Sequence, residues 1–227
     1  QWGGITEKLD YVYQAVEDLR KNAPEKALYG FAGAPWTLFC YLVEGEGSSD
    51  FWRPRAMLWQ KPAFCQEILG KLTEVIVQHL QKQAQAGADV LQVFDTWGGL
   101  LPAYDYRTFI LPHLQVMAEQ LRTPVMLFVR GGGHLLPMLA RLPVAGFSLD
   151  AATDVGEAGR ILGRCTQGNL DNVRLLGSAE GIEQGISEIA RSLGGRQNHI
   201  YNLGHGILPQ TPPEAVQVMV EAIRRQG

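Results

Sequence analysis

Short apolar runs alternate along the chain with longer amphipathic stretches. The short runs predict strands at residues 27–33, 90–95, 125–129, 145–149, 165–170 and 199–203. The stretches between them carry apolar residues at helical spacing. Helices are predicted there at residues 64–86, 107–121, 135–141 and 179–193, the first of them stopped by Gly87.

A leading helix is predicted at residues 6–21. Ile5, Leu9, Val12, Val16 and Leu19 follow one another at spacings of 4, 3, 4 and 3 residues, which places them on one face of that helix. No predicted strand precedes it.

Two more helices are predicted from the residues that begin them. Asp154 and Glu157 have the spacing of a capping box, in which a side chain at the helix start accepts a backbone N–H bond. The last helix is expected to be capped by Thr211, with Pro212 in its first turn and Glu214 closing the box.

Six strands, each followed by a helix, predict an α/β fold with a parallel sheet. The first turn from strand to helix reads Gly-Ala-Pro-Trp at residues 33–36 and lacks the glycine pattern of a dinucleotide-binding fold. A closed (β/α)₈ barrel needs eight strands and about 250 residues. We therefore expect residues 1–227 to be a single barrel domain with about six β/α units, and the first two units to lie upstream of Gln1.

Composition supports a folded core and narrows the function. Of 227 residues, 46% are hydrophobic and 19% charged, and the net charge of −3 excludes a protein that coats nucleic acid. Three widely spaced cysteines indicate a reducing compartment. No apolar run approaches the about 18 residues that span a membrane, and residues 1–4 lack the pattern of a signal peptide. We expect a cytoplasmic protein without nucleic-acid or membrane partners.

Polar or titratable residues follow every predicted strand, which is where barrel enzymes place their reacting groups. In chain order they are Thr37, Tyr41, Asp95, Thr96, Arg130, His134, Asp150, Asn169, Asp171, Asn202 and His205. His205 lies between two glycines, where a backbone can approach a ligand. Asp95 can cap the next helix or pair with a neighbour. Arg130 and its three following glycines can form an oxyanion clamp or a turn with a solvated arginine.

Metal and covalent catalysis find little support in the sequence. No HxC or HExxH motif is present, and no cysteine has ligand spacing to a histidine. No GxSxG elbow is present, and no lysine ends a predicted strand. His79, His113 and His199 are expected to be surface or packing residues. These patterns indicate a barrel enzyme that acts on a small anionic molecule.

Several longer strings resemble one family, the uroporphyrinogen decarboxylases. They are GFAGAPWTL at residues 30–38, YLVEG at 41–45, LQVFDTWGG at 91–99, QGNLD at 167–171 and NLGHGILP at 202–209, followed by TPPE at 211–214. Their order and spacing agree with the family from about residue 5 to the C-terminus. The resemblance implies a (β/α)₈ barrel that decarboxylates the four acetate side chains of uroporphyrinogen III to give coproporphyrinogen III. It also implies no metal, no organic cofactor and a homodimer.

The resemblance implies roles for individual residues. Tyr41 is expected near the reacting pyrrole, as the catalytic residue. Thr96, His205 and Arg130 are expected to bind substrate carboxylates. Phe94 and Phe31 are expected to pack on the macrocycle.

Some features depart from the family pattern. The aspartate that holds the pyrrole N–H groups and an arginine-rich loop have no counterpart here, so the 227-residue form alone is expected to be inactive. Arg130 replaces a usual lysine, Glu46 interrupts a glycine-rich run, Ala151 replaces a tryptophan and Asn172 a proline.

Two alternative functions stay open. One is a zinc-dependent methyltransferase of the same superfamily that acts on a methylated corrinoid. The other is a truncated, non-catalytic barrel that binds a tetrapyrrole.

Overall fold

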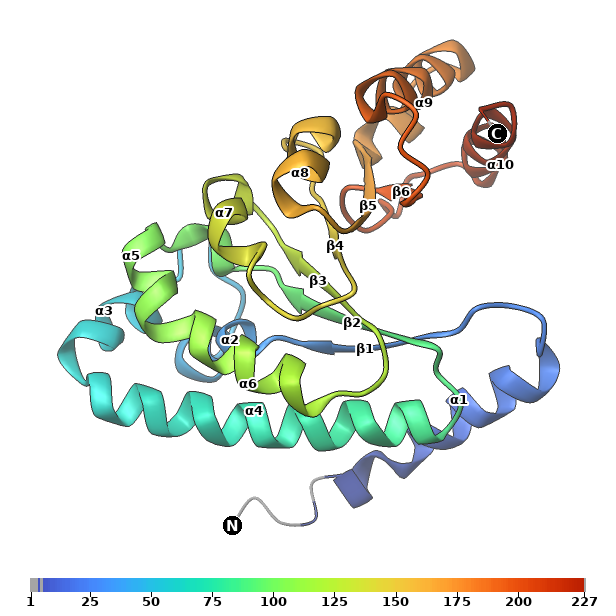
Figure 1. The fold of residues 1–227 in the computed structure, drawn as a ribbon. Coiled ribbons are helices and arrows are strands. Elements are labelled where there is room, and N and C mark those ends of the chain that lie inside the picture. Colours follow the sequence, from blue (N-terminus) through green and yellow to red (C-terminus); the bar gives the residue numbers. More distant parts are fainter. Residues whose placement is uncertain (1–3, 5, 227) are drawn as a thin grey trace. The chain divides into compact units, whose positions relative to one another are not determined.

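The computed structural model describes residue 4 and residues 6–226 (Figure 1). The described residues form strands β1 (Tyr29–Gly33), β2 (Val90–Asp95), β3 (Val125–Val129), β4 (Gly146–Ser148), β5 (Cys165–Leu170) and β6 (His199–Leu203). The helices are α1 (Asp10–Asn22), α2 (Pro35–Glu44), α3 (Trp52–Gln60), α4 (Pro62–Gln85), α5 (Ala103–Asp105), α6 (Leu111–Gln120), α7 (Leu136–Leu139), α8 (Val155–Leu162), α9 (Ala179–Leu193) and α10 (Pro213–Arg224). Short 3₁₀ segments are η1 (Thr6–Leu9), η2 (Gly98–Leu100), η4 (Gly132–Leu135) and η5 (Asn172–Leu176), and η3 (Tyr106–Ile110) is a π-helix. All six predicted strands are confirmed.

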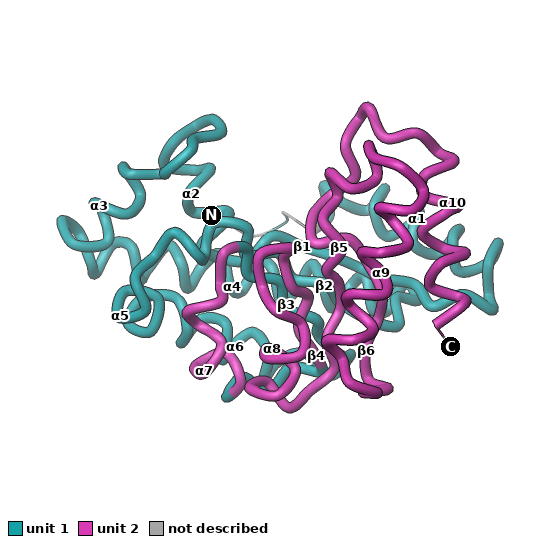
Figure 2. Tube along the Cα trace, turned by 90° about the horizontal axis from the view of Figure 1, so that it is seen from above, with its two compact units in different colours: residues 1–130, 141–145 teal, residues 131–140, 146–227 magenta. Residues whose placement is uncertain are grey.

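The chain forms two compact units (Figure 2). Unit 1 contains the residues up to Arg130 together with 141–145, and unit 2 contains residues 131–140 and those from Gly146 onward. In unit 1, β1, β2 and β3 pair in parallel in chain order, and in unit 2, β4, β5 and β6 do the same. The predicted β/α repeat is therefore present in both units. The single domain over residues 1–227 stays a prediction.

Helix α4 covers the sheet of unit 1 (Figure 1). It buries an apolar stripe that includes Leu69, Leu72, Ile76 and Leu80, as the spacing predicted. The chain leaves the helix at Gly87, whose φ of +115° is accessible to glycine and strained for other residues. None of the described helices is long and apolar enough to cross a membrane.

Helix α1 buries only part of the predicted face, in which Val16 is buried and Val12 is half-buried. Tyr13 and Val16 are its buried residues, while Leu19 is 56% exposed, so the prediction for Leu19 was wrong. Tyr13, Val16 and Arg20 share one face of the helix. The Tyr13 hydroxyl bonds to His79, and the Arg20 guanidinium donates to the turn after α4. An apolar side chain such as Leu19 could make neither hydrogen bond. Of the other members of the predicted face, Leu9 is also half-buried, and Ile5 lies outside the described residues.

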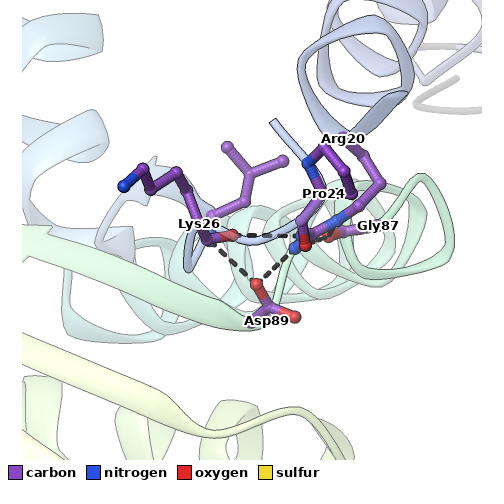
Figure 3. A network of polar contacts seen from close by, with 6 residues as sticks. Arg20, Pro24, Lys26, Gly87 and Asp89 are labelled. Carbon is purple, nitrogen blue, oxygen red and sulfur yellow. Dashed lines mark hydrogen bonds and ion pairs between the residues drawn. The ribbon is translucent and has the colours of Figure 1, made fainter. Parts of the chain in front are cut away.

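Arg20 joins α1 to the turn between α4 and β2 (Figure 3). Its guanidinium donates to the Gly87 carbonyl at 3.0 and 2.9 Å and to the carbonyls of Pro24 and Lys26 at 3.2 and 3.1 Å. It also pairs with Asp89, whose carboxylate accepts from the Leu28 N–H at 2.8 Å. The Leu28 N–H and then Arg20 lower the pKa of Asp89. The Arg20 side chain thus holds together the two segments that precede β1 and β2.

Replacing Arg20 with methionine is expected to lower the free energy of unfolding by about 1–2 kcal/mol, because several backbone carbonyls lose their donor. Urea unfolding followed by circular dichroism measures the change. Lys21→Met is the matched control: Lys21 is 71% exposed and reaches Asp18 only at 3.6 Å, so its removal should cost less than about 0.5 kcal/mol. Equal losses in the two variants would contradict this role of Arg20.

Two helices of unit 2 begin at capping side chains. Asp154 accepts from the Glu157 N–H at 2.6 Å and caps α8, which confirms the predicted helix start. Ser178 accepts from the Gly181 N–H at 3.2 Å and caps α9.

The predicted cap of the last helix was wrong. Pro212, not Thr211, is the N-cap of α10, and Pro213 occupies the first turn. A residue that precedes proline is held out of the helical region, and Pro212 accordingly has ψ 136°. The helix therefore cannot begin before Pro213, and the Thr211 hydroxyl is buried without a hydrogen-bond partner among the described residues.

The helix predicted at 107–121 begins earlier and contains a π-helical turn. Pro112 has no N–H to donate to the Thr108 carbonyl, and its ring crowds that carbonyl. The Leu111 N–H bonds instead to the Tyr106 carbonyl, five residues back. Tyr106 is thereby placed on the buried side of the segment, with no exposed surface.

Candidate functional site

Three phenylalanines form an aromatic row on one face of the unit 1 sheet. Phe94 pairs in register with Gly33 on β1 and with Phe128 on β3. The Phe94 ring centroid lies 6.2 Å from that of Phe31 and 6.0 Å from that of Phe128. Phe31 is 62% exposed and Phe94 38%, whereas their neighbours Ala32 and Val93 are buried. The structure therefore brings together two predicted macrocycle contacts, Phe31 and Phe94, as an open apolar surface.

The backbone of Phe31 is held by a side chain of α4. The Gln83 amide accepts from the Phe31 N–H and donates to the Phe31 carbonyl, both at 2.9 Å. Its nitrogen also lies 2.8 Å from His79 Nε2, which must therefore be the unprotonated acceptor. Burial lowers the pKa of His79. His79 is thus the packing residue that the sequence predicted.

Tyr41 and Arg130 both contact Trp97. The Tyr41 ring lies edge-on to Trp97, with centroids 6.3 Å apart, and to Phe51 at 5.8 Å. The Arg130 guanidinium lies 5.8 Å from the centroid of the Trp97 ring, a cation–π contact. Tyr41 is 42% exposed, Arg130 is exposed and Phe51 is fully buried. Two of the predicted substrate-binding residues, Tyr41 and Arg130, therefore contact the same aromatic side chain, Trp97.

Asp95 is fully buried behind this cluster. Its two carboxylate oxygens accept from the Thr37 hydroxyl at 3.0 Å and the Tyr106 hydroxyl at 2.8 Å. Burial raises its pKa to about 6, while the two hydroxyl donors lower it. Of the two roles considered for Asp95, pairing with neighbours is the one observed. Thr96, the next residue, is half-buried.

His205 lies in unit 2 on a loop held at both ends. The Gly204 N–H donates to the Leu170 carbonyl at 2.7 Å, and the Gly206 carbonyl accepts from Asn172 at 2.7 Å. Gly204 is buried and His205 is exposed. A Cβ on Gly204 would lie 2.4 Å from the Ala151 backbone nitrogen, so the close approach requires glycine.

Gly204→Ala is expected to displace the loop that carries His205 and to lower the free energy of unfolding by about 1–3 kcal/mol. Gly206→Ala is the matched control on the other side of His205, because a Cβ there meets nothing within 4 Å. Thermal unfolding of both variants measures the difference. A Gly206→Ala variant as unstable as Gly204→Ala would show that the contact with Ala151 is unimportant.

The glycines after Arg130 do not form a free oxyanion clamp. The Gly131 N–H donates to the Asp150 carboxylate, which also accepts from Thr153 at 2.8 Å. A cavity of about 400 Å³ beside them is lined by Asp150, Asp154 and Glu157 as well as by His134. Its acidic lining disfavours an anion, so the turn interpretation of these glycines is the better one.

Two other strand-end residues of unit 2, Asn169 and Asp171, bond to the backbone of neighbouring segments. Asn169 donates to the carbonyls of Asp150 and Thr153 at 2.7 and 2.6 Å, and Asp171 caps η5 through the Val173 N–H. Among the described residues, no group of three histidine, cysteine or acidic side chains could hold a metal ion.

Three supporting residues had not been singled out from the sequence: Phe51, Gln83 and Tyr106. Trp97, by contrast, lies in a string that carried the family resemblance, so a signal for it existed. Gln83 and Tyr106 lie on helices outside those strings, and only the packing of those helices shows their partners.

Comparisons with known proteins find one family model and several similar proteins. The family model described as uroporphyrinogen decarboxylase (URO-D) matches residues 4–226. The chain is 41% identical over 234 residues to the uroporphyrinogen decarboxylase of Coxiella burnetii (strain Dugway 5J108-111), covering 99% of this chain and 65% of that protein. It is 40% identical over 221 residues to that of Trichlorobacter lovleyi, covering 95% and 65%. The chain thus spans about 65% of the length of these relatives.

Two solved structures are similar in fold. A methyltransferase from Methanosarcina mazei has a TM-score of 0.82 at 22% identity, over 94% of this chain and 63% of that one. A B12-independent methionine synthase from Shewanella sp. has a TM-score of 0.68 at 10% identity, over 94% and 64%. At these identities the likeness concerns the fold alone. With the family match, it confirms the predicted (β/α)₈ barrel class, of which this chain carries about six units.

Proposed function

We propose, because this chain belongs to the uroporphyrinogen decarboxylase family, that the complete protein decarboxylates the four acetate side chains of uroporphyrinogen III to give coproporphyrinogen III. The observation that carries this proposal, beside the family, is the open aromatic row of Phe31 and Phe94. Exposed phenylalanine rings on a rigid sheet offer a flat tetrapyrrole an apolar surface to lie on.

Loss of carbon dioxide from a pyrrole acetate needs an acceptor for the electrons of the breaking bond. A protonated pyrrole ring is electron-poor and can take them, so the substrate supplies its own electron sink. The protein then has to orient the macrocycle, favour the cationic ring and return a proton to the new methyl group. Tyr41 suits the last part of this task, because its phenol is half-exposed while its ring is held by Phe51 and Trp97.

The substrate carries eight carboxylates, four on acetate and four on propionate side chains, and these need donors around the macrocycle. We assign Thr96, Arg130 and His205 to this role. Arg130 is exposed and oriented by Trp97, and His205 is exposed on a loop fixed at both ends. Charge-assisted hydrogen bonds of this kind are stronger than neutral ones and also fix the orientation of the ligand.

We also propose that the complete protein is a homodimer in the cytoplasm and that it works without a metal or organic cofactor. The family resemblance supports each of these points. Size-exclusion chromatography with light scattering tests the dimer.

The activity is tested by incubating the complete protein with uroporphyrinogen III under reducing conditions and separating the oxidised products by chromatography with fluorescence detection. Coproporphyrin III is expected as the final product, with partly decarboxylated intermediates before it. Binding of uroporphyrinogen without turnover would favour the non-catalytic alternative. Methyl transfer from a methylated corrinoid that depends on added zinc would favour the methyltransferase instead.

A further inference from the structure

We propose that Asp95 is a positioning residue of this site: its buried carboxylate, held by Thr37 and Tyr106, fixes the turn that carries Thr96 and Trp97. The inference rests on the proposed function, because it assigns Asp95 a task in placing the substrate-binding residues. Asp95 cannot touch substrate in this arrangement, since it has no exposed surface.

The carboxylate links three segments of unit 1. Asp95 ends β2, Thr37 lies in the first turns of α2, and Tyr106 begins the π-helical segment η3. Both oxygens are satisfied by hydroxyl donors, at 3.0 and 2.8 Å. A buried carboxylate without such donors would be strongly unfavourable, so the three segments are fixed relative to one another as long as Asp95 is ionised.

The same network continues into the turn after β2. The Thr37 hydroxyl, which donates to Asp95, lies 3.4 Å from the Trp97 N–H as an acceptor. The Trp36 indole N–H donates to the Trp97 carbonyl at 3.1 Å. A Cβ on Gly98 would lie 2.5 Å from an Asp95 carboxylate oxygen, so the turn is packed directly on that group. Trp97 in turn contacts Tyr41 and Arg130.

Protonation of Asp95 would disturb this arrangement. A neutral carboxyl donates a proton of its own, and if it donates to Thr37, the Thr37 hydroxyl proton loses its acceptor and the hydroxyl that also accepts from the Trp97 N–H must reorient. In the part of the chain that the structure describes, the titratable groups that face Asp95 are the Tyr106 phenol and the Cys40 thiol of α2, and burial raises the pKa of both. Both therefore stay neutral near pH 6, where Asp95 itself titrates.

The test uses the complete protein and two tyrosine variants from neighbouring positions. Tyr106→Phe removes one donor to Asp95 and keeps the buried ring. It is expected to lower kcat/KM for uroporphyrinogen III about 10-fold, because the turn shifts. It is also expected to move the acidic limb of the pH profile above its wild-type position near pH 6, because the lost donor favoured the charged form. Tyr104→Phe, whose ring is 63% exposed, should match the wild type in both respects.

A second variant separates this inference from the proposed function. Because the pKa of Asp95 is raised in the fold, the folded state should lose stability as the pH rises from about 4 to 6, and Asp95→Asn should remove that dependence. Its kcat/KM profile should also lose the limb near pH 6. Wild-type kcat/KM and an unshifted pH profile in folded Tyr106→Phe would overturn the positioning role. A wild-type protein that does not turn over uroporphyrinogen would instead overturn the proposed function, while the pH dependence of stability would still show whether Asp95 titrates as described.

Discussion

Tyr41→Phe in the complete protein is expected to lower kcat for uroporphyrinogen III by about 100-fold or more, the range in which positioned proton-transfer groups act. The phenylalanine ring keeps the edge-on contacts with Phe51 and Trp97, so the loss should come from the hydroxyl alone. KM should change little, because the hydroxyl contributes mainly in the transition state. Steady-state kinetics of coproporphyrinogen formation measures both constants.

Two further substitutions are the controls for Tyr41→Phe. Thr96→Val should cost less, about 10-fold in kcat/KM, because one hydrogen bond from an uncharged hydroxyl to a carboxylate is lost. Tyr11→Phe, at a side chain that is 67% exposed on α1, should leave both constants unchanged. A Tyr41→Phe variant with more than half of the wild-type kcat would exclude Tyr41 as the catalytic residue.

His205→Gln is the second change with a large expected effect. It should lower the rate of decarboxylation about 10- to 100-fold, because the imidazole donor to a substrate carboxylate is replaced by a weaker amide donor on a differently shaped side chain. Intermediates with five to seven carboxylates should accumulate, because the macrocycle is held less well between successive rounds. Chromatography of the oxidised products over time detects them.

His113→Gln is the control for this substitution. His113 lies on α6, where its ring bonds to Gln66 at 2.7 Å, and glutamine can keep a hydrogen bond there. Full activity in His205→Gln, or the same loss in both variants, would remove His205 from the site.

Much of the fold could be predicted from the sequence because it depends on local spacing. The apolar runs that became β2, β3, β5 and β6 have the predicted bounds. The glycine that stops α4 and the aspartate that caps α8 act within a few residues of their own positions. Where a residue's partner is near in the sequence, the local sequence pattern is sufficient to predict the structure.

The predictions were wrong where a distant partner or a backbone restriction determines which face is buried or where a helix begins. Leu19 was assigned to a buried face by spacing, but the face turns toward polar partners of Tyr13 and Arg20 that lie 66 and 67 residues away. Thr211 has the residue type and spacing of a cap, but two successive prolines move the helix start beyond it.

The candidate site shows the same division. The strand ends could be predicted, because a barrel places its reactive groups there, and Thr96 follows from that rule, whereas Phe31 and Phe94 were expected from the family resemblance alone. The side chains that support the site could not be predicted from the sequence. Tyr106 reaches Asp95 from the first residue of a π-helical segment, and Gln83 reaches Phe31 across 52 residues. Side chains that position a site are visible only once the helices are packed.

The most direct test is the ratio of carbon dioxide released to coproporphyrinogen III formed when the complete protein acts on uroporphyrinogen III labelled in its acetate carboxyl groups. The proposed function predicts four molecules of carbon dioxide for each product molecule, at a rate that added chelator does not change. A folded complete protein that binds uroporphyrinogen III and releases no labelled carbon dioxide would contradict it.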